Sequence, residues 1–446
     1  MDKKVSFISL GCKVNLYESV SIINTFKEHG FVEASFDEIC DVYIINTCTV
    51  TQTSDSKSKK MIRQAIKRNP DAFICVMGCF AQLNNEEVKK IDGINVLCGT
   101  SNRHLILPTV LKMMETGDKT LVDLTQKYDE ICEYENLTID HYDNKTRGFV
   151  KIQDGCENFC AYCAIPYSRG RFRSRDKDSI IKEIQVLTNH HMKEIVLTGI
   201  NTGAYGKDLT DLSFPKLLEE IILNVKGLGR LRISSIEATE VTKELLDVMK
   251  KYEEHFCMHL HIPIQGGSDE IIQAMHRKYD LSYYKEKIKL VRSYFPLINI
   301  TADVMVGFNG ETNELFDIAK KTIDEMNYGE IHVFPYSLRP NTLAYNESKK
   351  INFSDRIDNG TKKFRVNELL ALNEEKALLY REKFINKELV VLIETTSNGY
   401  ACGHSGNYLE IKVIDKENRL KQNDLVKVIL TKASYPVSTG VIIDVL

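Results

Sequence analysis

The first third of the chain alternates short apolar runs with longer runs in which apolar residues recur every three or four positions. The short runs are typical of buried strands, and the longer spacing is typical of helices with one packed face. Strands are predicted at residues 5–10, 42–46 and 73–77, and helices at 17–29 and 56–68. This order predicts a parallel sheet with crossover helices.

A second series of strand-like runs begins at residue 148 and continues with helical runs between the strands. The predicted strands are residues 148–153, 194–197, 230–233, 258–261, 298–306 and 330–334. Six such units are fewer than the eight of a closed barrel, and an open side admits a bulky substrate. The pattern predicts a partial (β/α)6 barrel of the TIM type.

The last segment changes to short alternating runs after a helix that extends through Phe384. These runs, at residues 389–395, 408–413, 425–431 and 440–445, predict a small antiparallel β-barrel. An acidic, tyrosine-bearing stretch up to residue 143 is typical of a linker. The fold class is therefore α/β with three expected domains, at residues 1–140, 141–373 and 374–446.

Composition narrows the class of protein. A net charge of −3 excludes a uniformly basic nucleic-acid binder, so phosphate contacts must come from local patches. No stretch approaches the roughly 20 apolar residues of a membrane span, and the N-terminal apolar run is too short for a signal peptide. A cytosolic location is expected. Thiols stay reduced there, so metal ligation is the favoured explanation for some of the twelve cysteines.

Three cysteines, Cys12, Cys48 and Cys79, follow the first three predicted strands. The carboxyl ends of parallel strands meet at one edge, which predicts that these thiols form a cluster site. Taken singly, each cysteine is more often a small buried apolar residue than a ligand. The repeated placement beside Gly, Asn or Thr favours the cluster. Six other cysteines share no such pattern and are interpreted as structural: Cys40, Cys75, Cys98, Cys132, Cys257 and Cys402.

The strand at residues 148–153 leads into Cys156, Cys160 and Cys163, a Cys-x3-Cys-x2-Cys spacing. Three thiolates this close can hold a cubane iron–sulfur cluster and leave its fourth iron open, where S-adenosylmethionine (SAM) can chelate and be cleaved reductively. Structural zinc is the alternative, but it prefers four ligands, and no fourth Cys or His lies at the usual spacing. Tyr162 fits a position that contacts adenine.

Five motifs resemble one family along essentially the whole chain. They are Gly-Cys-Lys-Val-Asn at 11–15, Asn-Thr-Cys-Thr-Val at 46–50, Gly-Cys at 78–79, the loop at 156–163, and His-Val-Phe-Pro-Tyr-Ser at 332–337. Together they resemble the radical-SAM methylthiotransferases. The first two most resemble the enzymes that convert N6-threonylcarbamoyladenosine in tRNA to its 2-methylthio derivative.

The resemblance implies two [4Fe-4S] clusters and SAM as cofactors. The cluster on Cys12, Cys48 and Cys79 would carry the sulfur that one SAM methylates. The catalytic cluster on Cys156, Cys160 and Cys163 would cleave a second SAM to form the radical that abstracts hydrogen from carbon two of adenosine 37, and sulfur transfer would follow. The implied partners are the tRNA anticodon loop and an electron donor such as flavodoxin or ferredoxin, with no membrane and no DNA.

Polar residues at the barrel strand ends are the expected cofactor contacts. By resemblance, Thr198, Gly199 and Asn201 would hold the methionyl end of SAM. Ser234, Glu237 and Gln265 would line the nucleoside pocket. Such residues are also ordinary turn formers. Two departures from the family pattern, Gly266 in place of serine and Asn309 in place of proline, are expected to change loop rigidity only.

Contacts to tRNA are expected from two places. Residues 405–408, Ser-Gly-Asn-Tyr, resemble the TRAM module that grips tRNA, and Tyr408 is the predicted contact; a purely structural barrel is the alternative because its charges nearly balance. Arg169, Arg171 and Arg173, followed by Arg175, suit phosphate because the guanidinium pairs with it in bidentate fashion. A second basic run, usually just a solvated face, is Lys57, Lys59, Lys60, Arg63, Lys67 and Arg68.

Three other functions remain open from the sequence. Two are methylthiotransferases of a different substrate, either an isopentenylated adenosine in tRNA or an aspartate of a ribosomal protein. The third is a non-catalytic RNA-binding protein whose cysteines hold structural metal. The first motif favours threonylcarbamoyladenosine, but only by resemblance.

Overall fold

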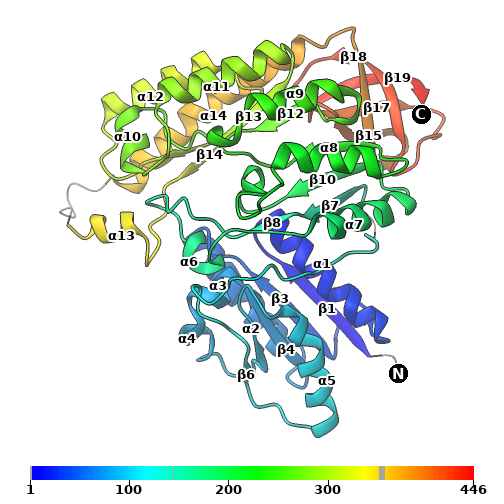
Figure 1. Cartoon of the computed structure of the whole chain (residues 1–446), viewed down its shortest axis with the longest axis vertical. Helices are drawn as coiled ribbons and strands as arrows, with labels where there is room; N and C mark the ends of the chain where they lie inside the picture. Colours follow the sequence, from blue (N-terminus) through cyan, green and yellow to red (C-terminus); the bar gives the residue numbers. More distant parts are fainter. Residues whose placement is uncertain (1–2, 144, 351–356) are drawn as a thin grey trace. The chain divides into compact units, whose positions relative to one another are not determined.

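The computed structural model describes residues 3–143, 145–350 and 357–446 (Figure 1). The chain forms two compact units. The N-terminal unit comprises Met1–Tyr142, Lys151–Arg175 and Ser337–Asn346. The barrel unit comprises Asp143–Val150, Asp176–Tyr336 and Glu347–Leu446. Both cysteine triads therefore lie in the N-terminal unit, whereas the C-terminal strands belong to the barrel unit.

The N-terminal unit is built on a six-stranded parallel sheet of order β2-β1-β3-β4-β5-β6. Its strands are β1 (Lys4–Ser9), β2 (Val32–Glu33), β3 (Val42–Thr47), β4 (Phe73–Gly78), β5 (Val96–Leu97) and β6 (Val122–Asp123). Its helices are α1 (Lys13–Glu28), α2 (Gln52–Arg68), α3 (Cys79–Leu83), α4 (Asn85–Val88) and α5 (Ile106–Thr116), with the 3-10 turn η1 (Arg103–Leu105). β3 and β4 are buried at every position, as expected for central strands of a parallel sheet.

The predicted helices occur, but both begin four residues earlier than predicted. α2 starts with a polar turn that carries no apolar periodicity, and the Thr51 side chain caps it by accepting a hydrogen bond from the Ser54 backbone N–H. The N-terminal unit also holds β8 (Gln153–Asp154), α6 (Ile165–Arg169) and β9 (Arg173–Ser174). β8 and β9 pair antiparallel on either side of the loop that carries the second cysteine triad.

The barrel unit contains six barrel strands in two sheets, of order β11-β10-β7 and β12-β13-β14. The strands are β7 (Arg147–Lys151), β10 (Glu194–Thr198), β11 (Arg230–Ile233), β12 (His259–His261), β13 (Asn299–Val306) and β14 (Glu330–Pro335). A parallel bridge between Leu231 and Phe256 connects β11 to the segment before β12. The partial α/β barrel predicted from the sequence is confirmed.

Helices and short turns connect these strands. They are α7 (Lys177–Asn189), η2 (Thr202–Ala204), α8 (Phe214–Asn224), η3 (Ala238–Glu240), α9 (Lys243–Lys251), η4 (Glu253–His255), α10 (Asp269–Ala274), α11 (Leu281–Tyr294) and α12 (Asn313–Met326). After β14 come α13 (Leu343–Ser348), most of which belongs to the N-terminal unit, and α14 (Asn359–Glu382). α14 packs along β14 and α12 (Figure 1). Across the described parts of the chain, none of the helices combines the length and apolarity of a membrane span.

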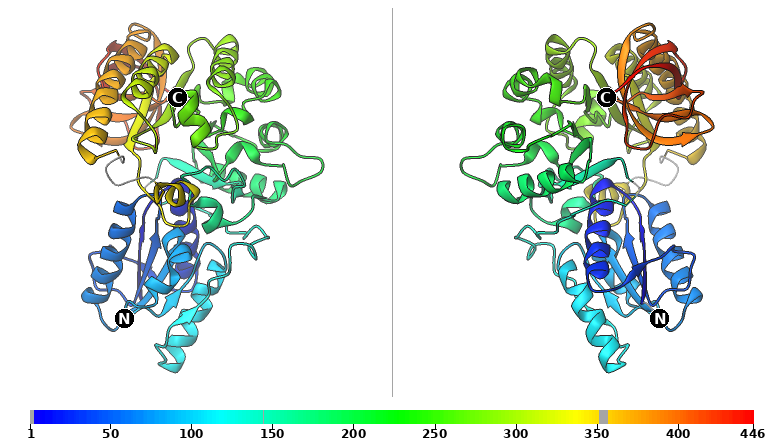
Figure 2. Two further views of the ribbon diagram at one scale, coloured as in Figure 1. Left: turned by 90° about the vertical axis from the view of Figure 1, so that its left-hand side faces the viewer. Right: turned by 90° about the vertical axis from the view of Figure 1, so that its right-hand side faces the viewer.

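The C-terminal strands form a closed barrel of order β15-β16-β17-β19-β18 (Figure 2). Its strands are β15 (Glu388–Ser397), β16 (Gly399–Ser405), β17 (Glu410–Asp415), β18 (Leu425–Lys432) and β19 (Val437–Val445). The sequence missed β16, because its glycines and small residues are typical of a loop. The predicted small barrel is confirmed: its strand pairs are antiparallel except for β17 and β19, which pair in parallel. A closed ring of five strands requires at least one parallel pair, since directions cannot alternate around an odd number.

Successive side chains on β17 alternate between the interior of this barrel and its surface. Ile411 is fully buried in the barrel core, whereas Ile414 on the same strand is 38% exposed. We expect Ile411→Ala to lower the free energy of unfolding by about 2–5 kcal/mol through lost burial and a cavity. Ile414→Ala, the matched control, should change it by less than about 1 kcal/mol. Urea unfolding followed by circular dichroism measures both; equal effects would contradict the assigned strand faces.

Candidate functional site

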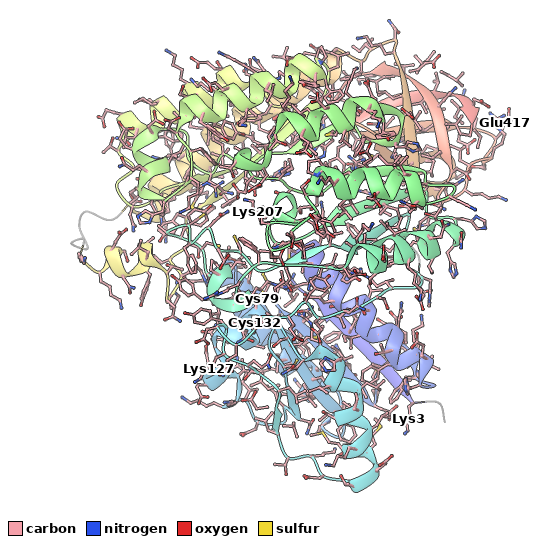
Figure 3. All side chains as sticks on the ribbon, in the orientation of Figure 1. Lys3, Cys79, Lys127, Cys132, Lys207 and Glu417 are labelled. Atoms are coloured by element: carbon pink, nitrogen blue, oxygen red, sulfur yellow. The ribbon has the colours of Figure 1, made fainter. Side chains whose placement is uncertain are left out.

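Cys12, Cys48 and Cys79 come together at the carboxyl edge of the N-terminal sheet. Cys12 precedes α1, and Cys48 follows β3. Cys79 follows β4 as the first residue of α3 and is labelled in Figure 3. A Cβ added to Gly11 would lie only 2.7 Å from the Cys48 Sγ atom. Burial, together with the neighbouring Cys79 and Cys12 thiols, raises the pKa of Cys48 to about 11. The predicted convergence of these three residues is therefore observed.

Glycine is needed where β4 turns into this site. Gly78 has a φ of +100°, and a Cβ there would lie 2.3 Å from the Asn46 Oδ1 atom and 2.5 Å from the Thr47 carbonyl oxygen. A side chain at this position would collide with β3. The absence of one lets the chain turn at once, so that Cys79 lies at the edge of the sheet.

The second triad, Cys156, Cys160 and Cys163, occupies the loop between β8 and α6, and all three residues are partly exposed. The Cys163 backbone N–H donates to the Cys160 carbonyl oxygen (2.9 Å), which forms a tight turn. Gly155 has a φ of +73°, and a Cβ there would lie 1.9 Å from the Arg171 carbonyl oxygen. The two ends of the loop are thus held together, while the thiols between them remain open to solvent.

A network of buried charges lies beside both triads within the N-terminal unit. Arg169 donates to Glu18 (2.8 Å) and Asp154 (3.0 Å). Lys151 donates to the same carboxylates at 2.8 and 2.6 Å, and Arg103 lies 3.0 Å from Glu18. Burial alone would raise the pKa of Glu18, but the three cations lower it to about 2. Both carboxylates therefore stay charged although they are buried.

Arg169 connects this network to the first triad. Its Nε–H donates to the Cys79 Sγ atom (3.3 Å), and its Nη2 donates to the Asn15 Oδ1 atom (2.8 Å). The Cys12 thiol in turn lies 3.7 Å from the same amide oxygen. One guanidinium at the end of α6, shortly after Cys163, thus touches the surroundings of Cys12 and Cys79. The sequence reasoning missed the partners Glu18, Asp154 and Arg103, for which the only signal was charge within otherwise buried elements.

The arginines predicted to contact phosphate differ in exposure. Arg169 is fully buried, and Arg173 is 5% exposed and donates to the carbonyl oxygens of Arg169 and Arg171. Arg175 is buried as well. The Arg171 side chain, in contrast, is 78% exposed. The structure gives Arg169 and Arg173 internal partners, and leaves Arg171 as the member of this set that faces solvent.

In the barrel unit, several predicted cofactor contacts adjoin one another. Thr198 ends β10 and Ser234 follows β11, and their hydroxyl oxygens lie 3.4 Å apart. Asn201 and Thr198 are buried, and Gly199 is half-buried. Glu237 is engaged by the Arg277 guanidinium. These residues occupy the carboxyl ends of adjacent parallel strands, where barrels of this class place ligand contacts.

Gln265 has an unusual backbone and an unsatisfied side chain. Its φ is +66°, a strained conformation for a residue with a Cβ. Its backbone is fixed by β13, because its N–H donates to the Asp303 carbonyl oxygen (2.9 Å) and its carbonyl accepts from the Met305 N–H (2.8 Å). Its Oε1 atom is buried and has no hydrogen-bond partner among the described residues. Such an atom is expected where a bound molecule supplies the missing donor.

Tyr408 lies inside the barrel unit. It adopts a φ of +63° in the turn between β16 and β17. Its ring stacks on His259, with centroids 4.9 Å apart, and the Arg232 guanidinium lies 4.7 Å from the ring centroid. Asn407 in the same turn accepts a hydrogen bond from Asn299. The residues that resemble a TRAM module therefore attach the C-terminal barrel to the barrel strands, and the ring of the predicted RNA contact is largely taken up by these partners.

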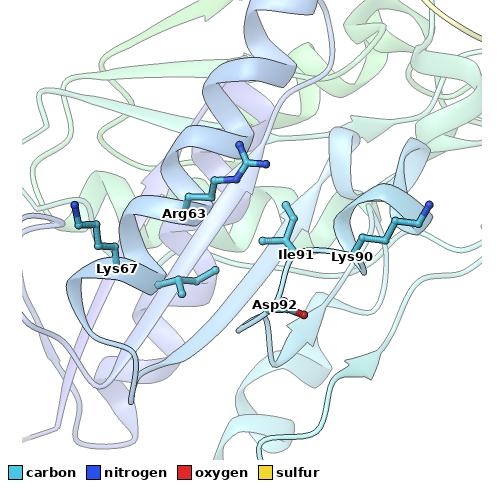
Figure 4. A pocket seen from close by; sticks show the side chains of 6 residues that line it. Arg63, Lys67, Lys90, Ile91 and Asp92 are labelled. Atoms are coloured by element: carbon cyan, nitrogen blue, oxygen red, sulfur yellow. The ribbon is translucent and has the colours of Figure 1, made fainter.

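The basic run on α2 reaches the protein surface beside α4. Arg63 and Lys67 line a cavity of about 350 Å³ together with Lys90 and Asp92 (Figure 4). Lys59, on the same helix, forms an ion pair with Glu87. The run therefore faces solvent as predicted, but acidic residues of the neighbouring segment offset part of its charge.

Comparison with known proteins identifies two matching families. Residues 4–99 match the uncharacterized protein family UPF0004, and residues 150–322 match the radical SAM superfamily. The threonylcarbamoyladenosine tRNA methylthiotransferase MtaB of Bacillus subtilis is 40% identical over 98% of this chain and 95% of its own length. The MtaB of Aquifex aeolicus is 34% identical over 96% of this chain and 100% of its own.

One relative that carries a different name has the same sequence identity as the Aquifex aeolicus protein. The tRNA-2-methylthio-N(6)-dimethylallyladenosine synthase of Sulfurihydrogenibium is 34% identical, covering 92% of this chain and 96% of its own. Among solved structures, the radical SAM methyltransferase TsrM from Kitasatospora setae, with cobalamin and a [4Fe-4S] cluster bound, matches with a TM-score of 0.59 and 14% identity over 78% of each chain. That likeness shows a shared fold.

The residues present suit the cofactors of such a family. Three cysteines on a partly exposed loop, none of them in a disulfide, suit an iron–sulfur cluster that binds a second ligand. The buried amide oxygen of Gln265, which has no hydrogen-bond partner among the described residues, suits a bound donor. The radical SAM match, together with the methylthiotransferase relatives, gives SAM and [4Fe-4S] clusters as the cofactors of this enzyme. The chain belongs to the radical-SAM methylthiotransferase family.

Proposed function

We propose that this enzyme adds a methylthio group to carbon two of N6-threonylcarbamoyladenosine at position 37 of tRNA. The observation that carries the proposal is the presence of two cysteine triads in one unit, joined by the network around Arg169. The two MtaB relatives support the threonylcarbamoyl substrate. The dimethylallyladenosine synthase among the relatives makes an isopentenylated adenosine the second candidate.

The two triads have different tasks in this proposal. Cys156, Cys160 and Cys163 hold the cluster that, with SAM bound, supplies reductive cleavage of a carbon–sulfur bond. Cys12, Cys48 and Cys79 hold the cluster that carries the sulfur to be transferred. Arg169 holds the two sites in fixed positions relative to each other, because it donates to Cys79 and to Asp154, which lies just before the loop at residues 156–163, here called the radical loop.

The remaining predicted contacts position SAM and the nucleoside. Thr198, Gly199 and Asn201 hold the methionyl end, and Tyr162 contacts the adenine. Ser234, Glu237 and Gln265 line the nucleoside pocket, where the strained Gln265 presents its amide oxygen to a donor. These side chains orient the two reactants, which lowers the barrier by removing the entropy cost of bringing them together.

Transfer RNA presents this base in the anticodon loop, where proteins read splayed bases and backbone. Arg171 and the exposed cations of α2 are the available phosphate contacts in the N-terminal unit. Reductive cleavage requires an electron donor, for which flavodoxin or ferredoxin is the expected class. A tRNA substrate and reduced thiols both suit a cytosolic location.

Nucleoside analysis tests the substrate. In a strain that lacks the gene, the 2-methylthio derivative of threonylcarbamoyladenosine should disappear from digested tRNA while its precursor accumulates, as measured by mass spectrometry. The wild-type gene should restore it, and a Cys156→Ala gene should not. Loss of the dimethylallyl derivative instead would select the second candidate, and unchanged nucleosides would reject a tRNA substrate.

The iron content tests the two triads. After anaerobic reconstitution with iron and sulfide, the wild type should hold about eight irons per chain, the content of two cubane clusters. The triple variant Cys12→Ala, Cys48→Ala, Cys79→Ala should hold about four. Cys132→Ala is the control, because this exposed cysteine lies outside both triads, and it should retain about eight. Eight irons in the triple variant would refute the first cluster.

Substitution of Arg169 tests the coupling between the sites. Arg169→Met leaves Glu18 and Asp154 with fewer cations in a buried setting and should lower the free energy of unfolding by about 3–5 kcal/mol. It should also shift the reduction potential of the first cluster downwards, because an N–H donor to the Cys79 sulfur is lost. Arg171→Met removes an exposed guanidinium and should change unfolding by less than about 0.5 kcal/mol.

Acid titration of the same proteins adds a second measure. The Glu18 pKa is lowered from 4.5 to about 2, so its stabilisation is present above 4.5 and is lost as the pH falls towards 2. In Arg169→Met the pKa of Glu18 should rise, and the loss of stability should begin at higher pH. An unchanged potential together with an unchanged acid transition would contradict the role given to Arg169.

A further inference from the structure

Three polar residues outside the sites described above share one face of the β12-β13-β14 sheet. His261 ends β12, Asp303 lies within β13, and His332 lies within β14. In the parallel register Asp303 pairs with His332, and His261 pairs with Thr301, two residues before Asp303. Because successive side chains on a strand alternate between faces, all of these side chains project to the same side.

The opposite face of these strands is apolar. Ala302 and Val304, which flank Asp303, are buried, as are Ile331 on β14 and Leu260 on β12. Those side chains form core contacts of the barrel unit. The sheet therefore separates the polar set from the apolar packing on its other face, and the polar side chains are available to bind a ligand.

The spacing of the three side chains suits one small ion. The His261 Nε2 atom lies 3.4 Å from the Asp303 Oδ1 atom, and the His261 and His332 ring centroids are 5.7 Å apart. One nitrogen or oxygen atom from each of the three residues lies within 4.8 Å of the others. Ligands bound to one metal at about 2.0–2.2 Å stand roughly 3–3.5 Å apart, a distance that small side-chain rotations would reach.

The His261 ring is already held in the orientation that a ligand needs. Its Nδ1 atom lies 2.9 Å from the Thr301 hydroxyl oxygen, and the same hydroxyl lies 2.9 Å from the His259 Nε2 atom. This leaves the Nε2 atom of His261 directed at Asp303. Histidines that bind metals are oriented in this way, by a second polar partner on the ring nitrogen that does not face the ion.

The set is also accessible. His332 is exposed, and the side chains of His261 and Asp303 are 13% and 30% exposed. Two imidazoles and one carboxylate favour first-row transition metals such as Mn²⁺, Fe²⁺, Co²⁺ or Zn²⁺ over Mg²⁺, which prefers oxygen ligands. Three protein ligands leave further coordination positions open.

We propose that His261, Asp303 and His332 bind one divalent first-row transition-metal ion, separate from both cysteine triads. The set uses neither the cysteines nor the predicted SAM contacts. It adjoins the pocket proposed for the nucleoside, because the Asp303 carbonyl oxygen accepts the Gln265 backbone N–H (2.9 Å). Its ion keeps open positions on the polar face of the β12-β13-β14 sheet. The alternative is a hydrogen-bonded cluster that holds no ion.

Manganese binding tests this site. Mn²⁺ disfavours thiolates, so it distinguishes this set from the cysteines, which are first filled by reconstitution with iron and sulfide. The full chain is then titrated with Mn²⁺ while free Mn²⁺ is followed by electron paramagnetic resonance. The wild type should bind one Mn²⁺ that Asp303→Asn binds at least about tenfold more weakly. Asp317→Asn, which changes an exposed carboxylate on α12, is the matched control and should bind as the wild type does.

Nitrogen couplings give an independent readout. Mn²⁺ bound to the wild type should show hyperfine coupling to imidazole nitrogen, and this coupling should weaken in His332→Gln. Circular dichroism of each variant checks that it is folded. Equal Mn²⁺ binding by the wild type and Asp303→Asn, or bound Mn²⁺ without nitrogen coupling, would overturn the proposal. Nucleoside analysis of the same variants is read separately, so a failure here leaves the proposed tRNA reaction untouched.

Discussion

The organisation of the N-terminal unit depends on a group of buried, mutually paired charges. Glu18 from α1 and Asp154 from β8 each need cations, and Arg169, Lys151 and Arg103 each need carboxylates. Any one of these charges buried alone would cost several kcal/mol. The set is stable only when α1, the strand before the radical loop and α6 are all in place. These charges are satisfied only when the segments are assembled. Both cysteine triads are correctly placed only in that assembled state.

Parallel strand topology explains why distant residues meet at the first triad. β1, β3 and β4 are neighbours in the sheet, so the residues that follow them emerge at one edge. The crossover helices α1 and α2 return the chain to the opposite edge before each new strand. Because the chain turns sharply at Gly11 and Gly78, Cys12 and Cys79 lie next to the strand ends rather than in a flexible loop. The sheet thus supplies a rigid base for ligands drawn from three separate segments.

Local patterns in the sequence were enough to predict most strands and the convergence of Cys12, Cys48 and Cys79, because apolar runs and the residues that follow them are recognised over short distances. The role of both triads as cluster ligands stays a prediction. Interactions between distant residues were not predicted. The sequence predicts a phosphate contact for Arg169 because its guanidinium suits phosphate. Its carboxylate partner Glu18 lies 151 residues away, and no local pattern reveals such a contact. β16 was not predicted because its two glycines are typical of a loop. Its buried positions alternate only because the barrel closes around them, and the residue types do not show that alternation. Tyr408 was assigned to RNA, since nothing near it in sequence indicates the His259 ring on which it stacks.

The residues that choose between the two candidate nucleosides must differ from those that hold the clusters and SAM. Relatives named for threonylcarbamoyladenosine and for dimethylallyladenosine both align along almost the whole chain, so the shared framework serves either substrate. The two substituents differ in chemistry, since one carries a carboxylate and a hydroxyl group and the other is a hydrocarbon. A site that offers hydrogen-bond donors to the first rejects the second by leaving buried polar groups unpaired. Specificity is therefore expected from the few side chains that touch the N6 substituent, and a change of substrate would require only those to change.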